Sequence, residues 1–313
     1  MGNKEGSQTM KIAVAGPGGV GAYYGGLLAR GGMDVTFLGR GKHLEALKTE
    51  GLRVKSYKGD FHINVKAGDN PSETGICDLI LFCVKSFDTK EVAQFIAPMV
   101  GTETIIISLQ NGVDNEEQLG QILGMEKVMA GVAFIGSRME EPGLIVHSAA
   151  GSITFGEIEG GLSERGEKVC RTFQSCGIEA RLSEDIKKVM WQKMVWNCGF
   201  NAITALTGCA VSNILSDKST REVVQKAMEE VVDLAQGLGI AVSRDLPQKT
   251  IAHTEKQGEI KTSMLMDMEK GRRMEIEALN GAVSKRGKEL KRETPVNDTL
   301  YSMVRAINKK RGF

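Results

Sequence analysis

The sequence predicts an α/β domain followed by an all-helical domain in a chain of 313 residues. Short β-rich runs alternate with helical segments up to Leu182, whereas helical periodicity with almost no strand signal continues from there to Phe313. Between the two textures, Ser183-Glu184-Asp185 offers a helix cap and acidic residues for a first helical turn. We therefore expect one domain over residues 10–183 and a second over residues 184–313.

Composition excludes several classes of protein. With 40 basic and 39 acidic residues, nothing overall favours nucleic acid or a membrane surface as partner, and apolar runs such as Leu79–Val84 are too short to span a bilayer. Six cysteines without a CxxC pair are typical of buried thiols in a reducing compartment, so we expect a cytoplasmic protein. The polar start, MGNKEGSQT, predicts a disordered leader. A homodimer is one assembly that this interpretation allows.

The first βαβ unit carries a glycine motif. Met10–Ala15 (MKIAVA) is a β-rich run, Gly16–Gly21 (GPGGVG) follows it, a helix is expected over Val20–Arg30, and a second strand over Asp34–Leu38. A GxGxxG motif between a strand and a helix, with the second strand at this distance, predicts a Rossmann-type dinucleotide-binding domain. The alternative is a glycine-rich turn in another α/β fold.

Each residue of this loop is expected to lie at the cofactor. Glycines 16 and 18 would let backbone N–H groups reach a pyrophosphate, while Gly21 would let the helix pack on the strand. The helix N-terminus adds partial positive charge. The predicted cofactor-binding loop is Gly16, Pro17, Gly18, Gly19, Val20 and Gly21.

The end of the second strand indicates which dinucleotide binds. An NAD-binding domain usually has Asp or Glu there, about 20 residues after the glycines, to hold the ribose hydroxyls. The segment Leu38–His43 has no carboxylate and offers cationic candidates instead. This pattern favours NADPH, with Arg40 as the main contact of the 2′-phosphate and Lys42 as a secondary one. A solvated basic loop is the alternative.

Further strands complete the predicted sheet. A hairpin is expected at residues 52–57 and 61–65, followed by buried parallel strands at 78–84 and 104–109. Ligands of doubly wound sheets bind beyond the carboxyl ends of the strands, so Lys85 and Asn111 are candidates for cofactor contacts and Asn111 also for a substrate contact. The rest of this half predicts strands at 127–136, 144–147, 152–155 and 178–182, and a helix at 162–175.

A polar row marks the first helix of the second half. In the apolar segment Trp191–Leu206, Lys193, Asn197 and Asn201 recur every four residues and would share one helix face. Burying unpaired amides and an ammonium is costly, so this row should face a polar ligand or a dense hydrogen-bond network. Another long helix is expected over Thr220–Leu238.

Ketone reduction by a nicotinamide cofactor would need a proton donor, and Lys193 is the candidate in this row. A nearby carboxylate, Glu275 or Asp267, would keep it protonated. A metal site is not expected, because the four histidines show no ligand spacing, and no GxSxG motif or catalytic cysteine context is present.

Together these motifs resemble the ketopantoate reductase (2-dehydropantoate 2-reductase) family. The resemblance rests on the glycine loop, FLGR ending at Arg40, CVKSFD around Lys85, LQNG around Asn111, KMVWNCGFNAITA from Lys193, and SMLMDMEKGRRMEIEALNG from Ser263. It implies a Rossmann domain followed by a helical domain, with the active site between them.

The resemblance also implies NADPH-dependent reduction of 2-dehydropantoate to (R)-pantoate, toward pantothenate and coenzyme A. It places the proton-donating lysine at Lys193, the active-site glutamate at Glu275, and substrate contacts at Asn111, Asn197, Asn201 and Ser263.

The chain departs from the family pattern after NAITALTG. Cys209-Ala210-Val211 stands where relatives often carry another substrate-contacting asparagine, with Ser212 and Asn213 just beyond. Two alternatives therefore stay open: an NADPH-dependent reductase of another small 2-oxo acid, and a non-catalytic NADPH-binding sensor.

Overall fold

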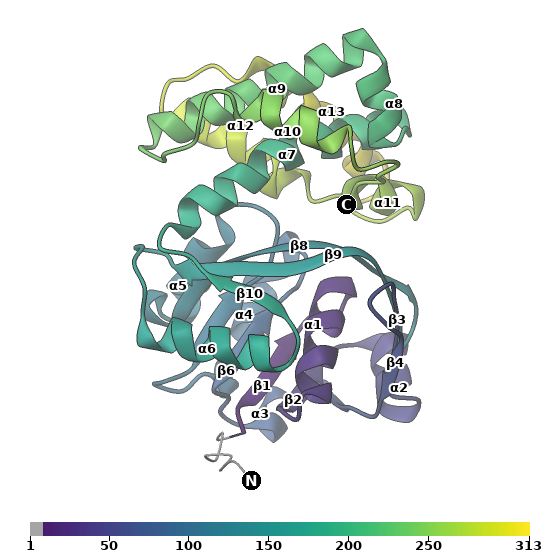
Figure 1. Cartoon of the computed structure of the whole chain (residues 1–313), viewed down its shortest axis with the longest axis vertical. Helices are drawn as coiled ribbons and strands as arrows, with labels where there is room; N and C mark the ends of the chain where they lie inside the picture. The colour runs from purple at the N-terminus through teal and green to yellow at the C-terminus, as the bar shows by residue number, and fades with distance from the viewer. Residues whose placement is uncertain (1–8) are drawn as a thin grey trace. The chain divides into compact units, whose positions relative to one another are not determined.

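The computed structural model describes residues 9–313 and divides into two compact units (Figure 1). One unit contains the chain up to Gln110 together with Asn115–Ile186, and the other contains Asn111–Asp114 together with Lys187–Phe313. The first is α/β and the second is helical, so the predicted fold class is confirmed. The expected leader, apart from Thr9, lies outside the described residues.

The first unit is built on a mixed sheet of ten strands within residues 9–313, in the order β4-β3-β9-β8-β7-β6-β1-β2-β5, with β10 paired to β9. Its centre is parallel, because β1 (Lys11–Ala15) lies between β2 (Asp34–Leu38) and β6 (Leu79–Phe82), and β6 pairs with β7 (Ile105–Ser108). The other strands are β3 (Leu52–Ser56), β4 (Phe61–Ile63), β5 (Lys66–Gly68), β8 (Val128–Glu141), β9 (Leu144–Glu157) and β10 (Glu179–Leu182).

Helices cover both faces of this parallel centre, as its continuous apolar strands require. Ile12 and Val14 of β1 belong to one apolar core with α1 (Gly19–Arg30) and α6 (Glu164–Ser175), while Ala13 and Ala15 belong to another with α4 (Thr89–Ile96) and α5 (Asn115–Leu123). Successive side chains of a strand point to opposite faces, which explains the alternation. The unit also contains α2 (Gly41–Thr49), α3 (Pro71–Thr74), η1 (Ser86–Asp88), η2 (Ala97–Met99) and η3 (Met125–Lys127).

Two long strands replace several short ones that the sequence predicts. β8 and β9 have 14 residues each and pair antiparallel around the turn at Pro142 and Gly143. The pairing shifts register at Phe134/Ile135 and Gly136/Ser137, and Ala150 and Gly151 have φ values of 56° and 116°. These bulges let one strand continue through residues that interrupt the alternating pattern.

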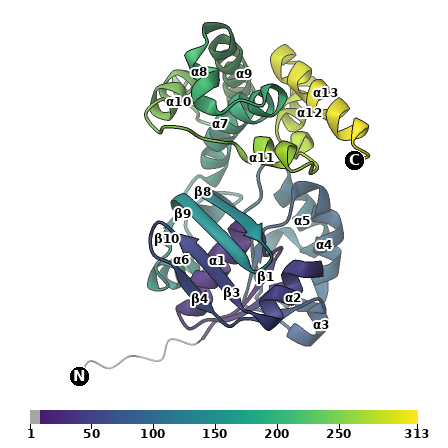
Figure 2. The same cartoon turned by 90° about the vertical axis from the view of Figure 1, so that its right-hand side faces the viewer.

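The second unit consists of helices around one apolar core. Its longest helix is α7 (Ile186–Thr207), which contributes Val195 and Phe200 to the core. The neighbours α12 and α13 lie side by side in Figure 2. The remaining elements are α8 (Val211–Ser216), α9 (Lys218–Gly237), α10 (Leu246–Thr254), α11 (Ser263–Glu269), η4 (Ile276–Ala278), α12 (Asn280–Glu289) and α13 (Pro295–Lys310).

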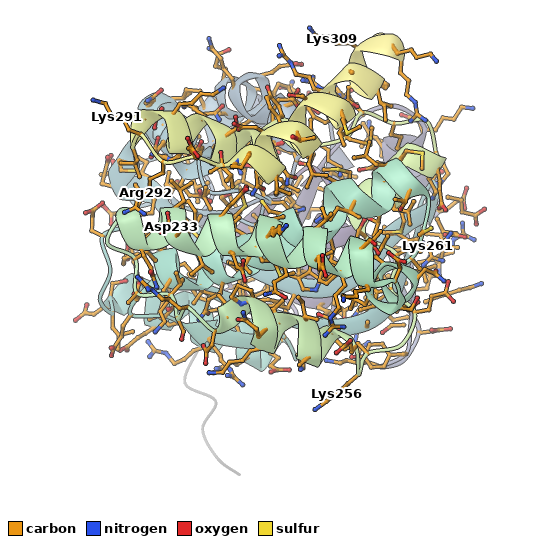
Figure 3. All side chains as sticks on the ribbon, turned by 90° about the horizontal axis from the view of Figure 1, so that it is seen from above. Asp233, Lys256, Lys261, Lys291, Arg292 and Lys309 are labelled. Atoms are coloured by element: carbon orange, nitrogen blue, oxygen red, sulfur yellow. The ribbon has the colours of Figure 1, made fainter. Side chains whose placement is uncertain are left out.

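Figure 3 labels several charged side chains of the second unit, among them Asp233, Arg292 and Lys309. Arg292, which follows α12, pairs with Asp233 of α9 at 2.6 Å, and Lys309 near the chain end is exposed. Within residues 9–313, no helix combines the length and apolarity that crossing a membrane would require.

Candidate active site

The glycine loop leaves its backbone open where a pyrophosphate would approach. Gly16 has a φ of +85°, which favours glycine, and the N–H of Gly18 donates to its carbonyl at 2.8 Å. A Cβ placed on Gly18 would meet no atom within 4 Å. The first turn of α1 contains no acidic residue, and the first N–H groups of a helix have no partner within it. The loop therefore fits a dinucleotide pyrophosphate, as the motif predicts.

The neighbouring glycines allow close packing instead. A Cβ on Gly21 would lie 2.5 Å from the carbonyl oxygen of Gly16, and one on Gly19 would lie 2.7 Å from the carbonyl oxygen of Ser137. The Ser137 hydroxyl also donates to the Gly19 carbonyl at 2.7 Å. The long strand β8 thus holds the start of α1 in place, a contact that the sequence pattern does not reveal.

His43 supports the same loop, and sequence reasoning did not assign it this position. Its Nδ1 accepts from the N–H of Gly143 at 3.0 Å, so its Nε2 carries the proton and donates to the Pro17 carbonyl at 2.7 Å. Burial lowers the pKa of the His43 imidazole. A neutral imidazole with both ring nitrogens hydrogen-bonded holds the glycine loop in place and adds no positive charge beside Arg40. Its position in α2 was hidden because no helix is predicted there.

Arg40 lies at the carboxyl end of β2 and is 80% exposed in its side chain. Its guanidinium faces the carboxylate of Asp88, at 3.5 Å, which follows β6. Because β1 lies between β2 and β6, this pair spans the end of the strand that leads into the glycine loop. An exposed guanidinium held only by a screened ion pair is available to a phosphate.

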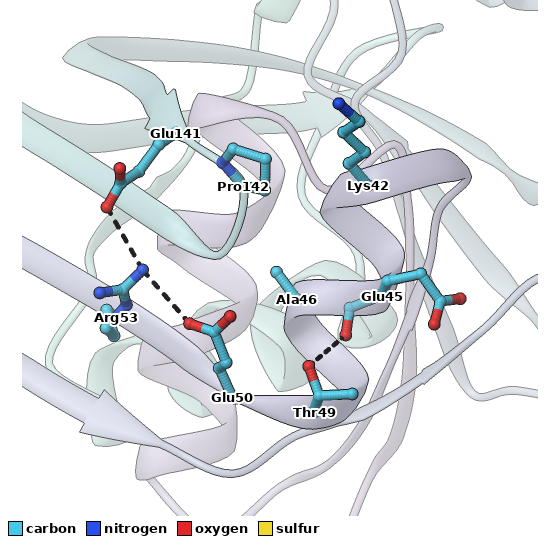
Figure 4. A pocket seen from close by; sticks show the side chains of 8 residues that line it. All are labelled: Lys42, Glu45, Ala46, Thr49, Glu50, Arg53, Glu141 and Pro142. Atoms are coloured by element: carbon cyan, nitrogen blue, oxygen red, sulfur yellow. Dashed lines mark hydrogen bonds and ion pairs between the residues drawn. The ribbon is translucent and has the colours of Figure 1, made fainter.

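Lys42 lies in a different setting, at the edge of a shallow surface hollow of about 450 Å³ (Figure 4). The hollow also contains Arg53, which pairs with Glu50 at 3.5 Å and with Glu141 at 3.3 Å. Glu45 adds a third carboxylate to its lining. This acidic lining makes the hollow itself unsuitable for phosphate, so Arg40 is the better placed cation.

The other strand-end candidates fall in different units. Lys85 directly precedes η1, after β6 in the first unit. Asn111 follows β7 and belongs to the short segment Asn111–Asp114 that groups with the helical unit. In that unit Asp114 accepts a hydrogen bond from the guanidinium of Arg286 at 2.6 Å, which ties the segment to α12. The two residues of this hydrogen bond are 172 positions apart in the chain, so local sequence patterns could not predict that the segment belongs to the helical unit.

The polar row is present on α7 and forms a hydrogen-bond network. Asn201 donates to the side-chain oxygen of Asn197 at 3.2 Å, and its own side-chain oxygen accepts from Ser263 at 3.4 Å and from the N–H of Met264 at 3.3 Å. Asn201 is only 1% exposed, whereas Ser263 is exposed. Asn201 of α7 thus links Asn197, on the same helix, to Ser263 at the start of α11.

Thr204 extends this row by one more turn, and the sequence interpretation missed it. Its hydroxyl lies 2.7 Å from that of Thr262, which caps α11 by accepting from the N–H of Leu265. Threonine is common in buried helices, where it bonds to its own backbone, so its role here was not apparent from the pattern. The start of α11 is therefore fixed to α7 at two points.

The negative charge of Glu275 acts on the ammonium of Lys193, the candidate proton donor. Burial lowers the pKa of the Lys193 ammonium to about 8, and the negative charge of Glu275 opposes that decrease. Glu275 is itself buried, in the loop before η4. An ammonium with a pKa near neutral holds its proton at physiological pH yet can release it, which suits a general acid.

Neither the cysteines nor the metal-ligating side chains of residues 9–313 form a second catalytic centre. All six cysteines are free thiols, and burial raises the pKa of Cys77 to about 11 and that of Cys83 to about 12, which disfavours a nucleophilic thiolate. In the part of the chain that the structure describes, His, Cys, Asp and Glu side chains form no group of three or more that could hold a metal ion.

Comparison with known proteins identifies the family. The model of "Ketopantoate reductase PanE/ApbA" matches residues 12–160, and the model of its C-terminal domain matches residues 185–308. The chain belongs to the ketopantoate reductase family. It is therefore an oxidoreductase. The α/β unit with the glycine loop corresponds to the first family domain, and the helical unit corresponds to the C-terminal one.

Relatives in this family extend over the whole chain. A 2-dehydropantoate 2-reductase of Archaeoglobus fulgidus is 33% identical, covering 96% of this chain and 98% of the relative. The crystal structure of 2-dehydropantoate 2-reductase from Geobacter metallireducens has a TM-score of 0.91 at 36% identity, covering 95% of this chain and all of the other. The ternary structure of D-mandelate dehydrogenase with NADH and anilino(oxo)acetate has a TM-score of 0.90 at 25% identity, covering 97% and 100%.

Proposed function

We propose that this protein reduces 2-dehydropantoate to (R)-pantoate with NADPH, a step toward pantothenate and coenzyme A. The observation that carries the proposal is the position of Lys193 one turn before the buried Asn197 on α7, with the charge of the buried Glu275 acting on its ammonium, which suits Lys193 to donate one proton next to a polar substrate. The names of the full-length relatives support the choice of substrate.

The reaction needs one hydride and one proton. A bound nicotinamide would supply the hydride for the keto carbon, whose C=O bond would become a C–O single bond. Lys193 then donates a proton from Nζ to the alkoxide oxygen, which completes the hydroxyl group. Glu275 stabilises the ammonium before transfer, because its charge opposes the effect of burial on the pKa of Lys193.

Amide and hydroxyl groups would orient the substrate. We assign Asn197, Asn201 and Ser263 to contacts with its carboxylate and hydroxyl, and Asn111 to the region where substrate and cofactor meet. Ser263 is exposed and its hydroxyl donates to the side-chain oxygen of Asn201, whose amide nitrogen in turn donates to Asn197, so these groups are preorganised. Ser212 and Asn213 lie in the first turn of α8 rather than in a loop, and their exposed side chains would supply further polar contacts.

The preference for NADPH rests on Arg40. The segment Leu38–His43 contains no carboxylate for a ribose 2′-hydroxyl, and the Arg40 guanidinium is exposed at the end of β2. Arginine binds phosphate by two parallel hydrogen bonds. Gly16–Gly21 would hold the pyrophosphate. Lys85 follows β6, the strand that pairs with β1, and would contact the cofactor from there.

A spectrophotometric assay tests this proposal directly. NADPH oxidation is followed with 2-dehydropantoate, ketoisovalerate and oxaloacetate, and the proposal expects the highest kcat/KM for 2-dehydropantoate. A higher value for another acid would keep the chemistry and change the substrate. Absence of turnover with every acid would instead favour a non-catalytic NADPH-binding sensor.

A second candidate is the reduction of an aromatic 2-oxo acid with NADH. It is favoured by the likeness to D-mandelate dehydrogenase, whose structure contains NADH and an anilino-substituted oxo acid. Phenylglyoxylate with NADH is therefore included in the same assay. A homodimer and a cytoplasmic location remain predictions of the sequence.

A further inference from the structure

We propose that Asn308, near the end of α13, is a positioning residue that fixes Glu275 through the backbone of Met274. The side-chain oxygen of Asn308 accepts from the N–H of Met274 at 3.1 Å, and its amide nitrogen donates to the Met274 carbonyl at 2.9 Å. Both backbone groups of the residue before Glu275 are therefore held by one side chain. This proposal rests on the proposed role of Glu275.

The segment that Asn308 holds has no regular structure of its own. Residues 272–275 lie between the turn after α11 and the start of η4, outside any helix or strand, although the N–H of Arg272 still donates to the Asp267 carbonyl of α11 at 2.8 Å. Met274 is fully buried, and buried N–H and C=O groups must find a partner. Asn308 offers one acceptor and one donor in the arrangement that a neighbouring strand would provide.

Asn308 is itself rigidly placed. It is 3% exposed, and α13 is packed into the helical core through Leu300 and Val304. After the helix, the N–H groups of Arg311 and Phe313 donate to the Asn308 carbonyl. Asparagine is a poorer helix former than alanine, so local helix propensity does not explain its presence in α13. The two bonds to Met274 do.

A shift of Met274 would move Glu275 relative to Lys193. Glu275 is the charged group that opposes the effect of burial on Lys193. Asp267 of α11 is another buried carboxylate of the same unit. Loosening the Met274 backbone should weaken the Glu275 contribution, and the ammonium should then lose its proton at lower pH.

The test compares Asn308→Ala with a matched control, Asn297→Ala. Asn297 is also a buried asparagine of α13, but its amide donates to the Ala227 carbonyl and to the carboxylate of Glu230, away from Met274. For each variant we would measure the melting temperature, kcat and KM with NADPH and 2-dehydropantoate, and the pH dependence of kcat. Asn308→Ser serves if the alanine variant does not fold.

We expect both variants to lose thermal stability, whereas only Asn308→Ala should shift the alkaline limb of the kcat profile to lower pH. Its kcat at pH 8 should fall about three- to tenfold, because protonation above the pKa changes tenfold per pH unit. An unshifted limb in a folded Asn308 variant, or the same shift in Asn297→Ala, would overturn the proposal.

A second readout does not depend on turnover. The pH dependence of acetylation of Lys193, followed by mass spectrometry, reports the pKa of its amine without substrate. If the wild type reduces no 2-oxo acid, the proposed function fails, yet this measurement still decides whether Asn308 acts on the Lys193–Glu275 pair. Equal labelling profiles for wild type and Asn308→Ala would reject it.

Discussion

Replacing Glu275 by glutamine should shift the pH dependence of the reaction in a defined direction. A general acid must be protonated, so kcat falls as pH rises through the pKa of Lys193. Burial lowers that pKa to about 8 and Glu275 counteracts burial. Glu275→Gln removes the charge but keeps the side-chain size, so only the lowering influence remains and the alkaline limb must move to lower pH.

The size of the change follows from the pair. A nearby opposite charge commonly moves a pKa by about one to three pH units, and each unit above the pKa costs about tenfold in the protonated fraction. With a pKa of about 8, Lys193 is roughly three-quarters protonated at pH 7.5. We therefore expect kcat at pH 7.5 to fall by about threefold for a shift of one pH unit and by about 200-fold for a shift of three.

The assay is the pH profile of kcat and of kcat/KM between pH 5.5 and 9.5 in buffers of constant ionic strength. Glu277→Gln is the matched control, because Glu277 is exposed and lies two residues further along the chain. It should leave the profile unchanged. A Glu275→Gln enzyme with the wild-type alkaline limb would refute the reasoning that Glu275 holds the proton on Lys193.

Three further predictions concern the donor and the cofactor loop. Lys193→Ala should lower kcat by about 10² or more, as expected for loss of a general acid, and near-normal turnover would exclude that role. Arg40→Ala should weaken binding of adenosine 2′,5′-bisphosphate far more than binding of 5′-AMP in calorimetry, and equal losses for both nucleotides would contradict the 2′-phosphate assignment. Asp88→Asn should strengthen binding of the bisphosphate, because it removes a negative charge beside Arg40. Gly18→Ala should leave the melting temperature unchanged and raise the Kd for NADPH, because its Cβ would enter the open space where the pyrophosphate is expected. Gly21→Ala should instead lower the unfolding free energy by about 1 to 3 kcal/mol through overpacking. A destabilised Gly18→Ala and an unaffected Gly21→Ala would show that the loop is arranged differently.

Local patterns predicted the elements whose signals are local. The strand Asp34–Leu38 is observed with the predicted bounds, and α1 begins one residue before the predicted Val20, because strand, glycine loop and helix each leave a distinct pattern. The same reasoning missed α2, α4 and α5. The segment of α2 is short and begins with basic residues, so its three buried positions were too few to show a helical apolar pattern.

The site was predictable to the extent that its residues share one helix. Spacing alone placed Lys193, Asn197 and Asn201 on one face of α7, and the acid-free end of β2 made Arg40 the candidate contact of a 2′-phosphate. The resemblance was needed to select Glu275, since Asp267 was an equal candidate by composition. The roles of His43 and Thr204 could not be inferred, because their partners lie 26 and 58 residues away or more.

The sequence by itself determined that a dinucleotide-binding α/β domain precedes a helical one, and that Lys193, the proposed proton donor, shares one helix with Asn197 and Asn201. Periodicity and turn chemistry act over a few residues, so they are readable without a fold. Only the tertiary structure decided that Glu275 acts on Lys193, that Asp88 faces Arg40, and that Asn308 holds the backbone before Glu275. Those interactions join segments far apart in the chain, where electrostatics and the pairing of buried polar groups depend on distances that only folding sets.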